Sequence, residues 1–274
     1  MLRCLYVDLD GTLLGPGASL LRGADGGWSS AGVRALEACH RAGVEVVIYT
    51  GRRQAQVRED ARLIGQTAYI FEAGSGLVVD GELEWLTGGL VPRDGKTIHE
   101  LITETGAPAL LLERYPNALE YHDPWHLDRE VSHLFRGLVD AFEADALLRE
   151  HGIEGLRLVD NGTVHSRSPA LAALPQVRAY HLVPAAASKA NAVARHMRIR
   201  GYAPEECIAV GDSREDMGAA EAVGAFWLVA NALERDPTLR DAIAGRPNVR
   251  VAEGRYGEGV YEAVVTTLAQ QRAG

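Results

Sequence analysis

Short apolar runs recur along the chain, and segments with a helical pattern separate most of them. The apolar runs lie at residues 2–9, 44–49, 68–71, 207–210 and 225–229. Runs that are apolar throughout are typical of strands covered on both faces in a parallel sheet. Helices are predicted at residues 29–41, 53–63, 188–200, 214–223 and 259–271. This alternation predicts a doubly wound parallel α/β sheet, with Ser29 as the cap of the first helix.

The middle of the chain departs from this alternation. Apolar runs lie at residues 109–112, 156–159 and 178–183, helical patterns lie at 95–105 and 140–151, and turns are predicted at Pro124 and at Asn161-Gly162. The mixture predicts an α+β insertion. We therefore expect a core formed by residues 1–84 and 185–274, with residues 85–184 as an inserted domain.

Two carboxylates stand one residue apart where the first apolar run ends, in the stretch YVDLDGTLL. Asp8 and Asp10 are at positions i and i+2 of an extended segment, so both point to the same side, and Gly11 can supply a tight turn. An Asp-Gly pair alone is a common turn. A turn alone accounts for one acid but not well for two. Because ligands of open α/β sheets bind at the carboxyl ends of the strands, the pair indicates a binding or catalytic site there.

Polar residues also follow two other apolar runs. Thr50-Gly51-Arg52 follows the run at 44–49, and Gly211-Asp212-Ser213-Arg214-Glu215-Asp216 follows the run at 207–210. Lys189 begins the helix before that second run. Four acids, a hydroxyl and a lysine thus map to one rim of the predicted sheet. Carboxylates gathered in a low dielectric repel one another, which implies a hard divalent cation bound by oxygen, with Mg²⁺ as the natural candidate.

These residues resemble the four motifs of the haloacid dehalogenase superfamily of phosphohydrolases, in the order that the superfamily has them. Asp8-Leu9-Asp10-Gly11-Thr12 resembles the DxDGT motif, and Thr50-Gly51-Arg52 resembles the second motif. Lys189 resembles the third motif, and Gly211-Asp212-Ser213 with Asp216 resembles the GDSxxD motif. The resemblance implies a Rossmann-like core, and the insertion between the second and third motifs resembles a C2-type cap of the C2B subtype, as in Cof-type sugar phosphatases.

The resemblance also implies roles for single residues. Asp8 is the expected nucleophile that becomes an aspartyl phosphate, and Asp10 is the expected acid and base. Thr50 is expected to hold a phosphoryl oxygen, and Lys189 to balance the charge on nucleophile and phosphoryl group. Gly51 and Arg52 are expected to contact substrate. The expected Mg²⁺ ligands are Asp8, Asp10 and Asp212, with Asp216 either beside the metal or holding Lys189.

Several functions are compatible with these motifs. The favoured one is a Mg²⁺-dependent phosphomonoesterase acting on a small phosphorylated metabolite, most readily a sugar or polyol phosphate. A dedicated mannosyl-3-phosphoglycerate, sucrose-phosphate or trehalose-phosphate phosphatase is an alternative. A mutase is disfavoured because the superfamily's mutase type has its cap between the first and second motifs. A receiver-type signalling domain is also disfavoured, because its phosphorylated Asp lies on a later strand and its domain is about half as long as this chain. A sensor that binds a phosphorylated metabolite without turnover is the alternative from another class.

The predicted cap contains polar and aromatic side chains that could face a leaving group. They are His122, Trp125, His126, His133, Arg136, His165, Arg167 and Arg178. We expect Arg136 and Arg167, together with His133, to meet sugar hydroxyls or a second anionic group. His122 and His126 have the helical spacing of a zinc pair, but Pro124 between them disfavours a regular helix, so a metal role for this pair is disfavoured.

Two positions depart from the resemblance. Glu215 stands where many C2B members have Asn, and we expect it to face solvent at the start of a helix, with an altered substrate contact as the alternative. Ala73 stands where the Asn of an Asn-Gly pair is usual, and Gly74 follows it. Neither departure affects the residues of the four motifs.

Composition and charge restrict the partners. The 274-residue chain is 47% hydrophobic, which suffices for a substantial core, and its net charge of −9 disfavours nucleic acid or an anionic membrane as partner. Cys4, Cys39 and Cys207 are far apart, so neither a disulfide framework nor a thiolate metal site is expected. With no apolar run long enough to span a bilayer, we expect a cytoplasmic protein, monomeric or homodimeric, whose partner is its small phosphorylated substrate.

Overall fold

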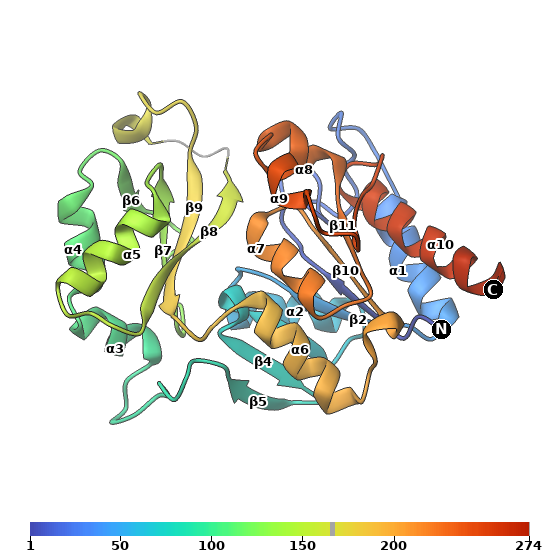
Figure 1. The fold of residues 1–274 in the computed structure, drawn as a ribbon, viewed down its shortest axis with the longest axis horizontal. Coiled ribbons are helices and arrows are strands. Elements are labelled where there is room, and N and C mark those ends of the chain that lie inside the picture. Colours follow the sequence, from blue (N-terminus) through green and yellow to red (C-terminus); the bar gives the residue numbers. More distant parts are fainter. Residues whose placement is uncertain (165–167, 274) are drawn as a thin grey trace.

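The computed structural model describes residues 1–164 and 168–273 and has two lobes. An eight-stranded sheet with helices on both sides forms the larger lobe, which contains both chain termini (Figure 1). A four-stranded sheet with three helices forms the smaller lobe. The fold is thus α/β, as the sequence predicts. We keep 1–84 with 185–274, and 85–184, as the proposed division into core and cap.

The large sheet has its first strand near its centre. Its order is β12-β11-β10-β1-β2-β3-β4-β5. Strand β1 (Cys4–Val7) pairs in parallel with β2 (Glu45–Tyr49) on one side and with β10 (Cys207–Gly211) on the other. The other strands are β3 (Ala68–Phe71), β4 (Gly76–Val79), β5 (Glu82–Trp85), β11 (Ala225–Leu228) and β12 (Val249–Val251). All are parallel except β4 and β5, which form an antiparallel edge.

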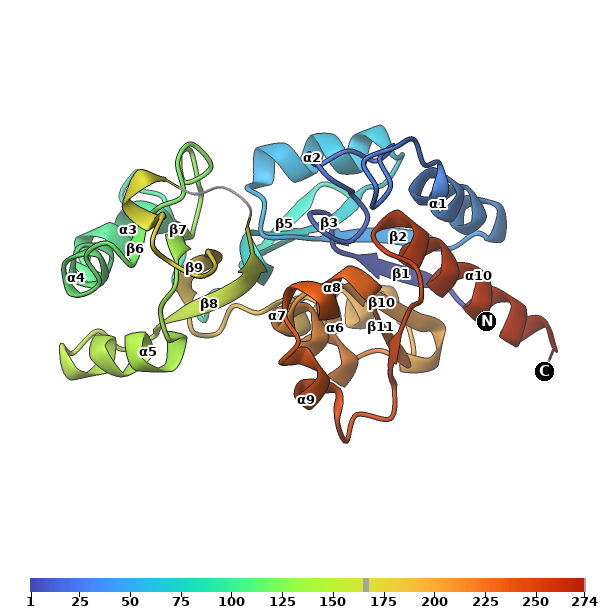
Figure 2. The same cartoon turned by 90° about the horizontal axis from the view of Figure 1, so that it is seen from above.

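Helices cover both faces of this sheet. The helices are α1 (Ala31–Ala42), α2 (Gln54–Leu63), α6 (Lys189–Arg200), α7 (Arg214–Met217), α8 (Ala230–Arg235), α9 (Leu239–Ile243) and α10 (Gly257–Ala273). Figure 2 shows α1 and α2 on one side of the sheet and α6 and α7 on the other, the doubly wound arrangement. Helix α10 packs against α1, and the two chain termini lie near each other (Figures 1 and 2). The parallel strands are almost wholly buried between these layers.

The smaller sheet has helices on one face and the core on the other. Its antiparallel order is β6-β7-β9-β8, with β6 (Leu119–Tyr121), β7 (His133–Gly137), β8 (Leu156–Thr163) and β9 (Arg178–Pro184). The helices are α3 (Ile98–Glu104), α4 (Ala107–Arg114) and α5 (Ala141–Glu150). They pack on the sheet around a separate apolar core that includes Ile102, Leu111 and Phe135. The opposite face of the sheet lies toward the larger lobe (Figure 2).

Two local predictions were wrong, and one apolar run in the middle of the chain is helical. The apolar run at 109–112 belongs to helix α4, which begins after Gly106 with Pro108 in its first turn, where a proline is tolerated. Asn161-Gly162 lies inside strand β8, where a register shift between Asp160 and Thr163 marks a bulge in place of a turn. The cap residue of α1 is Ser30, although the hydroxyl of Ser29 accepts a bond from the Ala31 N–H at 3.3 Å.

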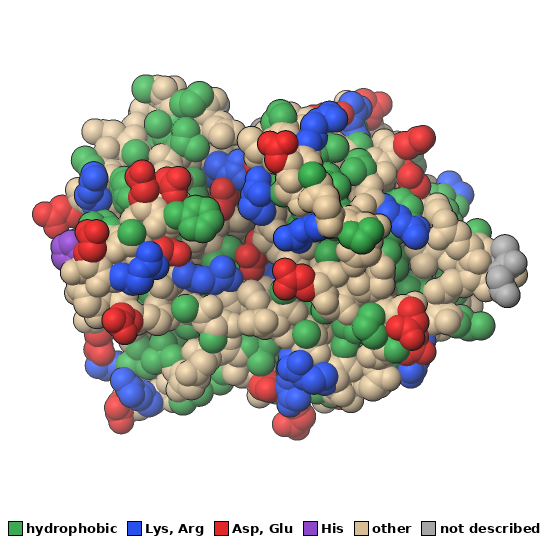
Figure 3. Space-filling view, in the orientation of Figure 1, with side chains coloured by type: hydrophobic (Ala, Val, Ile, Leu, Met, Phe, Trp, Pro, Cys, Tyr) green, Lys and Arg blue, Asp and Glu red, His purple; other side chains and the backbone are tan. Residues whose placement is uncertain are grey.

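The surface charges are mixed in sign, and the cysteines are not paired. Acidic and basic side chains are interspersed over the face in Figure 3, including the seam between the two lobes. The three cysteines are free and buried. Within residues 1–164 and 168–273, none of the helices is long and apolar enough to cross a membrane.

Candidate active site

The carboxyl ends of three neighbouring parallel strands carry the motif residues. Asp8 directly follows β1, Thr50 directly follows β2, and Asp212 directly follows β10. Because β1 lies between β2 and β10 in register, these residues meet at one edge of the sheet. The structure therefore brings together residues that are far apart in sequence, as the apolar pattern predicts.

Lys189 is the cation at the centre of this edge. Its ammonium Nζ donates to Asp8 Oδ1 at 2.9 Å and to Asp216 Oδ1 at 2.5 Å, and the residue is only 1% exposed. Burial alone would lower the pKa of Lys189, but the charges of Asp216 and Asp8 raise it well above its usual value. Lys189 is thus held as a buried cation between two carboxylates.

Asp216 is already fully engaged by protein groups. Its second oxygen, Oδ2, accepts from the N–H of Asp212 at 3.1 Å, from the N–H of Ser213 at 3.0 Å and from the Ser213 hydroxyl at 2.7 Å. The Ser213 hydroxyl in turn accepts from the Asp216 N–H, which forms a capping box at the start of α7. Of the two roles predicted for Asp216, this geometry favours holding Lys189 and the loop after β10.

Three carboxylates converge beside Lys189. Oxygens of Asp8, Asp212 and Asp216 all lie within 4.8 Å of one another. Burial raises the pKa of Asp8 well above its usual range despite the opposing charge of Lys189, and burial followed by the charge of Asp216 raises the pKa of Asp212 to about 7. This excess negative charge and this all-oxygen donor set fit a hard divalent cation such as Mg²⁺.

Gly11 is required by the close approach of the first and fourth motifs. It has φ +93°, a conformation that favours glycine, and a Cβ there would lie 2.2 Å from Asp212 Oδ2. The Gly11 carbonyl accepts from the Asn231 side chain at 2.8 Å, which fixes the loop after β1. Arg235 Nη1 lies 3.3 Å from Asp212 Oδ2 and provides a second cation near the carboxylates. Asn231 and Arg235 come from α8, for which the sequence shows no motif.

Asp10 and Arg52 bind each other. Arg52 Nε and Nη2 each donate to one oxygen of Asp10 at 2.7 Å, and Arg52 Nη1 donates to Asp60 at 2.9 Å. The side chain of Asp10 is 53% exposed, and its carboxylate is not part of the cluster of three acids. Thr50 is buried, and its hydroxyl accepts from the Arg52 N–H at 3.2 Å. In this state the Arg52 guanidinium is occupied by two core acids.

Two cap side chains lie directly on Gly51. A Cβ at Gly51 would be 2.7 Å from His181 Nε2 and 2.9 Å from Asn161 Nδ2, so the absence of a side chain lets the cap approach the second motif. His181 comes from β9, and Asn161 comes from the bulge in β8. Burial, and next the charge of Arg129, lowers the pKa of His181 well below its usual value. We expect a neutral imidazole at this position.

Glu72 fastens the core to the cap. It is completely buried, and its carboxylate accepts from the backbone N–H groups of Glu130, Val131 and Ser132 and from the Ser132 hydroxyl. Arg129 lies 3.8 Å from the same carboxylate, and its Nη1 donates to the Gly51 carbonyl at 3.0 Å. We call Glu72, Arg129, Ser132 and His181 the junction cluster, since the Ser132 hydroxyl also lies 3.1 Å from His181 Nδ1.

The predicted cap residues are dispersed. Arg136 lies on the same sheet face as His181, because its register partner is Ala179, and its Nε donates to Glu120 at 2.6 Å. His133 points to the opposite, helix-covered face, where it stacks on His99 at 3.8 Å between centroids, so it does not share a sheet face with Arg136 and His181. Arg167, like His165, lies outside the described residues.

The remaining predicted cap residues do not form a single group. His126 stacks on Tyr121, and burial lowers the pKa of His122 to about 4. Trp125 is 54% exposed. Arg178 bridges the two lobes, with Nε 2.6 Å from Asp160 and Nη2 3.1 Å from Asp236 in the core.

The two departures from the motifs have structural explanations. Glu215 does not face solvent as expected: its side chain is 14% exposed, lies 3.4 Å from Arg157 of the cap, and accepts from the Lys189 N–H at 3.3 Å. Ala73 has φ +56°, the left-handed conformation that Asn and Gly adopt more readily than Ala. Glu215 is therefore another contact between core and cap, and Ala73 carries backbone strain next to Glu72.

Sequence reasoning missed the junction cluster, although one member carried a signal. Glu72 follows the apolar run at 68–71 directly, in the same position relative to its strand as Asp8 relative to β1. The rule applied to the other strand ends would have identified it. Arg129, Ser132 and His181 have no comparable signal, because their role depends on how the cap sheet is placed over the core.

Comparison with known proteins gives full-length matches to phosphatases. A scan against models of protein families finds no match. The phosphoglycolate phosphatase of Methanoculleus marisnigri is 28% identical over 275 residues, covering 96% of each chain. The phosphoglycolate phosphatase of Archaeoglobus fulgidus is 27% identical over 265 residues, covering 96% of this chain and 95% of the relative.

Solved structures match the whole fold, the cap included. The sucrose-phosphatase of Synechocystis sp. PCC6803, solved with sucrose and phosphate, gives a TM-score of 0.67 at 18% identity and covers 97% of this chain and 98% of that one. BT1666 of Bacteroides thetaiotaomicron, described as a phosphatase of the HAD superfamily, gives 0.63 at 18% identity, covering 97% and 95%. The chain is therefore similar along its full length to curated phosphatases, and it shares its fold with solved phosphatases of the haloacid dehalogenase superfamily.

Proposed function

We propose that the protein is a Mg²⁺-dependent phosphomonoesterase that hydrolyses a small phosphorylated metabolite through an aspartyl phosphate on Asp8. The observation that carries the proposal is the placement of Asp8 beside Lys189, with Asp212 and Asp216 converging on the same point. A nucleophilic carboxylate needs neutralised surroundings to approach a phosphate, and a buried ammonium 2.9 Å away supplies part of that neutralisation.

Two displacements complete the reaction. In the first, an Asp8 carboxylate oxygen bonds to phosphorus while the ester P–O bond breaks, and the leaving alkoxide takes a proton from Asp10. In the second, water attacks the phosphorus of the aspartyl phosphate and gives its proton to Asp10, which releases phosphate and restores the Asp8 carboxylate. Lys189 stays charged throughout, and the Thr50 hydroxyl donates to a phosphoryl oxygen of the bound substrate.

Asp8 and Asp212 would hold the metal, because the oxygens of Asp216 are engaged by Lys189 and the loop after β10. When bound, Mg²⁺ offsets the charge of these carboxylates and of the phosphoryl oxygens. Asp10 must be free of Arg52 to carry a proton. We therefore propose that the substrate draws Arg52 away from Asp10, which leaves Asp60 as the partner that keeps the guanidinium near the site.

The first candidate substrate is phosphoglycolate or a similarly small phosphorylated acid. Relatives with this activity match along the full chain at 27–28% identity. His181 and Asn161 lie against Gly51, which favours a small leaving group facing the cap. Sugar and polyol phosphates are the second candidates, supported by the likeness in fold to a sucrose-phosphatase at 18% identity.

The test is phosphate release from a panel of phosphoglycolate and of sugar, polyol, disaccharide and nucleotide monophosphates, with Mg²⁺ and with EDTA. We expect turnover of phosphoglycolate to be fastest and to vanish with EDTA. Asp8→Asn should lower kcat by more than about 10⁴-fold while the far-ultraviolet circular dichroism stays unchanged. Radiolabelled phosphate trapped on the wild type by acid quenching should be absent from this variant.

Three outcomes would change the assignment. Turnover by folded Asp8→Asn would refute the nucleophile. A clear preference for a sugar phosphate would replace phosphoglycolate and leave the mechanism in place. No turnover of any compound by the folded, Mg²⁺-loaded protein would favour the non-catalytic sensor.

A further inference from the structure

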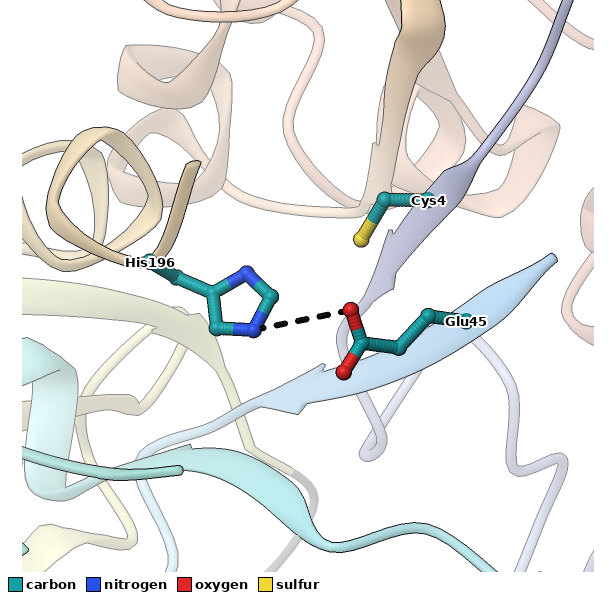
Figure 4. A group of neighbouring side chains, drawn as sticks. All are labelled: Cys4, Glu45 and His196. Atoms are coloured by element: carbon teal, nitrogen blue, oxygen red, sulfur yellow. Dashed lines mark ion pairs between the residues drawn. The ribbon is translucent and has the colours of Figure 1, made fainter. Parts of the chain in front are cut away.

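A second cluster of metal-ligating side chains lies at the opposite end of the sheet from Asp8. Atoms of Cys4, Glu45 and His196 all lie within 4.8 Å of one another (Figure 4). Cys4 opens β1, Glu45 opens β2, and His196 lies on α6. Sulfur, imidazole nitrogen and carboxylate oxygen form the donor set that zinc prefers, unlike the all-oxygen set at the active site.

His196 is oriented as a metal ligand would be. Its Nδ1 lies 2.8 Å from the Tyr6 hydroxyl, and the residue is 0% exposed. Its Nε2 makes no hydrogen bond to any described residue and faces Glu45, with 3.7 Å between Nε2 and Oε2. That distance is long for a hydrogen bond and close to the separation of two ligands on one zinc ion, about 3.4 Å for tetrahedral bonds of 2.0–2.1 Å. Apart from this long ion-pair contact with Glu45, the buried nitrogen makes no hydrogen bond, which is costly, so its orientation calls for an explanation.

The surroundings supply the supporting contacts that metal ligands usually have. Arg200 donates to Glu45 Oε1 at 2.9 Å, and the Tyr202 hydroxyl donates to Oε2 at 2.9 Å, which fixes the carboxylate. The Tyr6 hydroxyl does the same for the imidazole, in the manner of a second-shell partner. One thiolate and one carboxylate would offset the charge of a divalent ion, so a bound ion would leave no excess charge in this buried place.

A second thiol lies beside Cys4, outside the group of three donor atoms. Cys207 of β10 is the register partner of Cys4, so its side chain points to the same face of the sheet. Burial raises the pKa of the Cys4 thiol well above its usual value, with the neighbouring thiol of Cys207 as the next cause.

We propose that Cys4, Glu45 and His196 bind a structural zinc ion. The ion would join three elements that also carry the catalytic residues. Strand β1 leads to Asp8, β2 leads to Thr50, and α6 begins at Lys189. The site would thus stabilise the relative positions of nucleophile, threonine and lysine from the far end of the sheet.

The test uses cobalt as a spectroscopic probe of zinc sites. Metal-free full-length protein carrying Asp8→Asn is titrated with Co²⁺ in the presence of excess Mg²⁺, so that binding at the carboxylate cluster is suppressed. We expect one equivalent of Co²⁺ to produce the near-ultraviolet thiolate-to-cobalt charge-transfer band and the intense visible bands of tetrahedral cobalt. Zn²⁺ should displace the cobalt and abolish both, and should raise the melting temperature.

Variants separate this site from adventitious binding. Cys4→Ser should abolish the charge-transfer band, and His196→Gln should weaken Co²⁺ binding by at least about 100-fold. Tyr6→Phe, which removes only the supporting hydroxyl, should weaken binding by about 10-fold. Cys39→Ser is the matched control, because Cys39 is an equally buried free thiol on α1 outside the cluster, and it should bind Co²⁺ as the parent does.

Either of two results would overturn the proposal. One is a folded parent protein that shows no thiolate-to-cobalt band at excess Co²⁺. The other is a band that persists unchanged in Cys4→Ser while disappearing in Cys39→Ser. Neither result bears on the proposed phosphatase chemistry, because the titration is read without substrate in a variant that lacks the nucleophile.

Discussion

The catalytic edge of the core and the junction cluster are built in different ways. At the edge, each important side chain directly follows a strand or begins a helix, so its place is fixed by a short local segment. At the junction, Glu72 of the core binds backbone N–H groups at 130–132 of the cap, nearly sixty residues further along the chain. Local segments can be recognised in one sequence, whereas contacts between two lobes depend on the placement of whole sheets.

Both regions are also buried ion-pair networks, and this similarity sharpens the contrast. Lys189 joins two carboxylates within the core, and Glu72 joins a cap arginine to the core. The first network is expected to control chemistry, and the second to control how firmly the cap is held. Variants at the two places should therefore separate turnover from stability.

The largest effect is expected at Lys189. Lys189→Met keeps the length of the side chain but leaves Asp8 and Asp216 without their cation, so turnover should fall by about 10³-fold or more. In metal-free protein the unfolding free energy should fall by about 3–5 kcal/mol, measured by urea unfolding, because a buried charge pair loses one partner. Arg195→Met on the same helix is the control and should behave like wild type, since its pair with Glu84 is about 40% exposed.

The next effect is expected at Glu72. Glu72→Gln presents an amide N–H₂ group to backbone donors and leaves Arg129 unpaired, so the unfolding free energy should fall by about 2–5 kcal/mol. Limited proteolysis should also cut more quickly at residues 86–97, which connect the lobes. Glu84→Gln, in an exposed ion pair, is the matched control and should change stability by less than about 1 kcal/mol. If Glu72→Gln and wild type had the same melting temperature, the junction cluster would not be what holds the cap on the core.

A smaller effect is expected where the two regions touch. Gly51→Ala places a Cβ 2.7 Å from His181 Nε2, closer than Cβ atoms approach other groups, so the cap side chains must move away. We expect KM to rise about 10-fold while the unfolding free energy falls by only about 1 kcal/mol. Adding His181→Ala should restore KM at least in part, and Gly218→Ala, where the nearest side chain is 3.5 Å away, should leave KM unchanged. If Gly51→Ala left KM unchanged, the contact between the cap and Gly51 would have no role in substrate binding.

The smallest effect is expected in the pH dependence of stability. Burial lowers the pKa of His181 in the folded protein, so the unfolded chain, with a histidine pKa of about 6.5, takes up the proton first as the pH falls. This histidine therefore contributes a loss of stability that begins as the pH falls below about 6.5. His181→Asn should flatten the dependence of melting temperature on pH in that range, whereas His151→Asn, at an exposed position, should retain the wild-type slope.

The parts of the fold and site that could be predicted are those with local signals. The strands that end at Asp8, Thr50 and Asp212 are short apolar runs followed by turn-forming residues, and each was placed within about two residues. The run at 109–112 could not be assigned from the sequence, because a short apolar run in a helix cannot be distinguished by period from a buried strand. Asn161-Gly162 failed because turn chemistry also serves a bulge, and there the bulge brings Asn161 onto Gly51.

The contact between Lys189 and Asp8 spans 181 residues of sequence, and β1 is completed on one side only by β10. A polypeptide emerging from the ribosome therefore cannot form the catalytic edge until almost four fifths of it has been synthesised. Until then the central strand is an unpaired edge, which favours aggregation. Early folding of the inserted domain would shorten the loop between β5 and α6 and lower the entropic cost of closing it. The insertion would then assist assembly of the core as well as cover its active site.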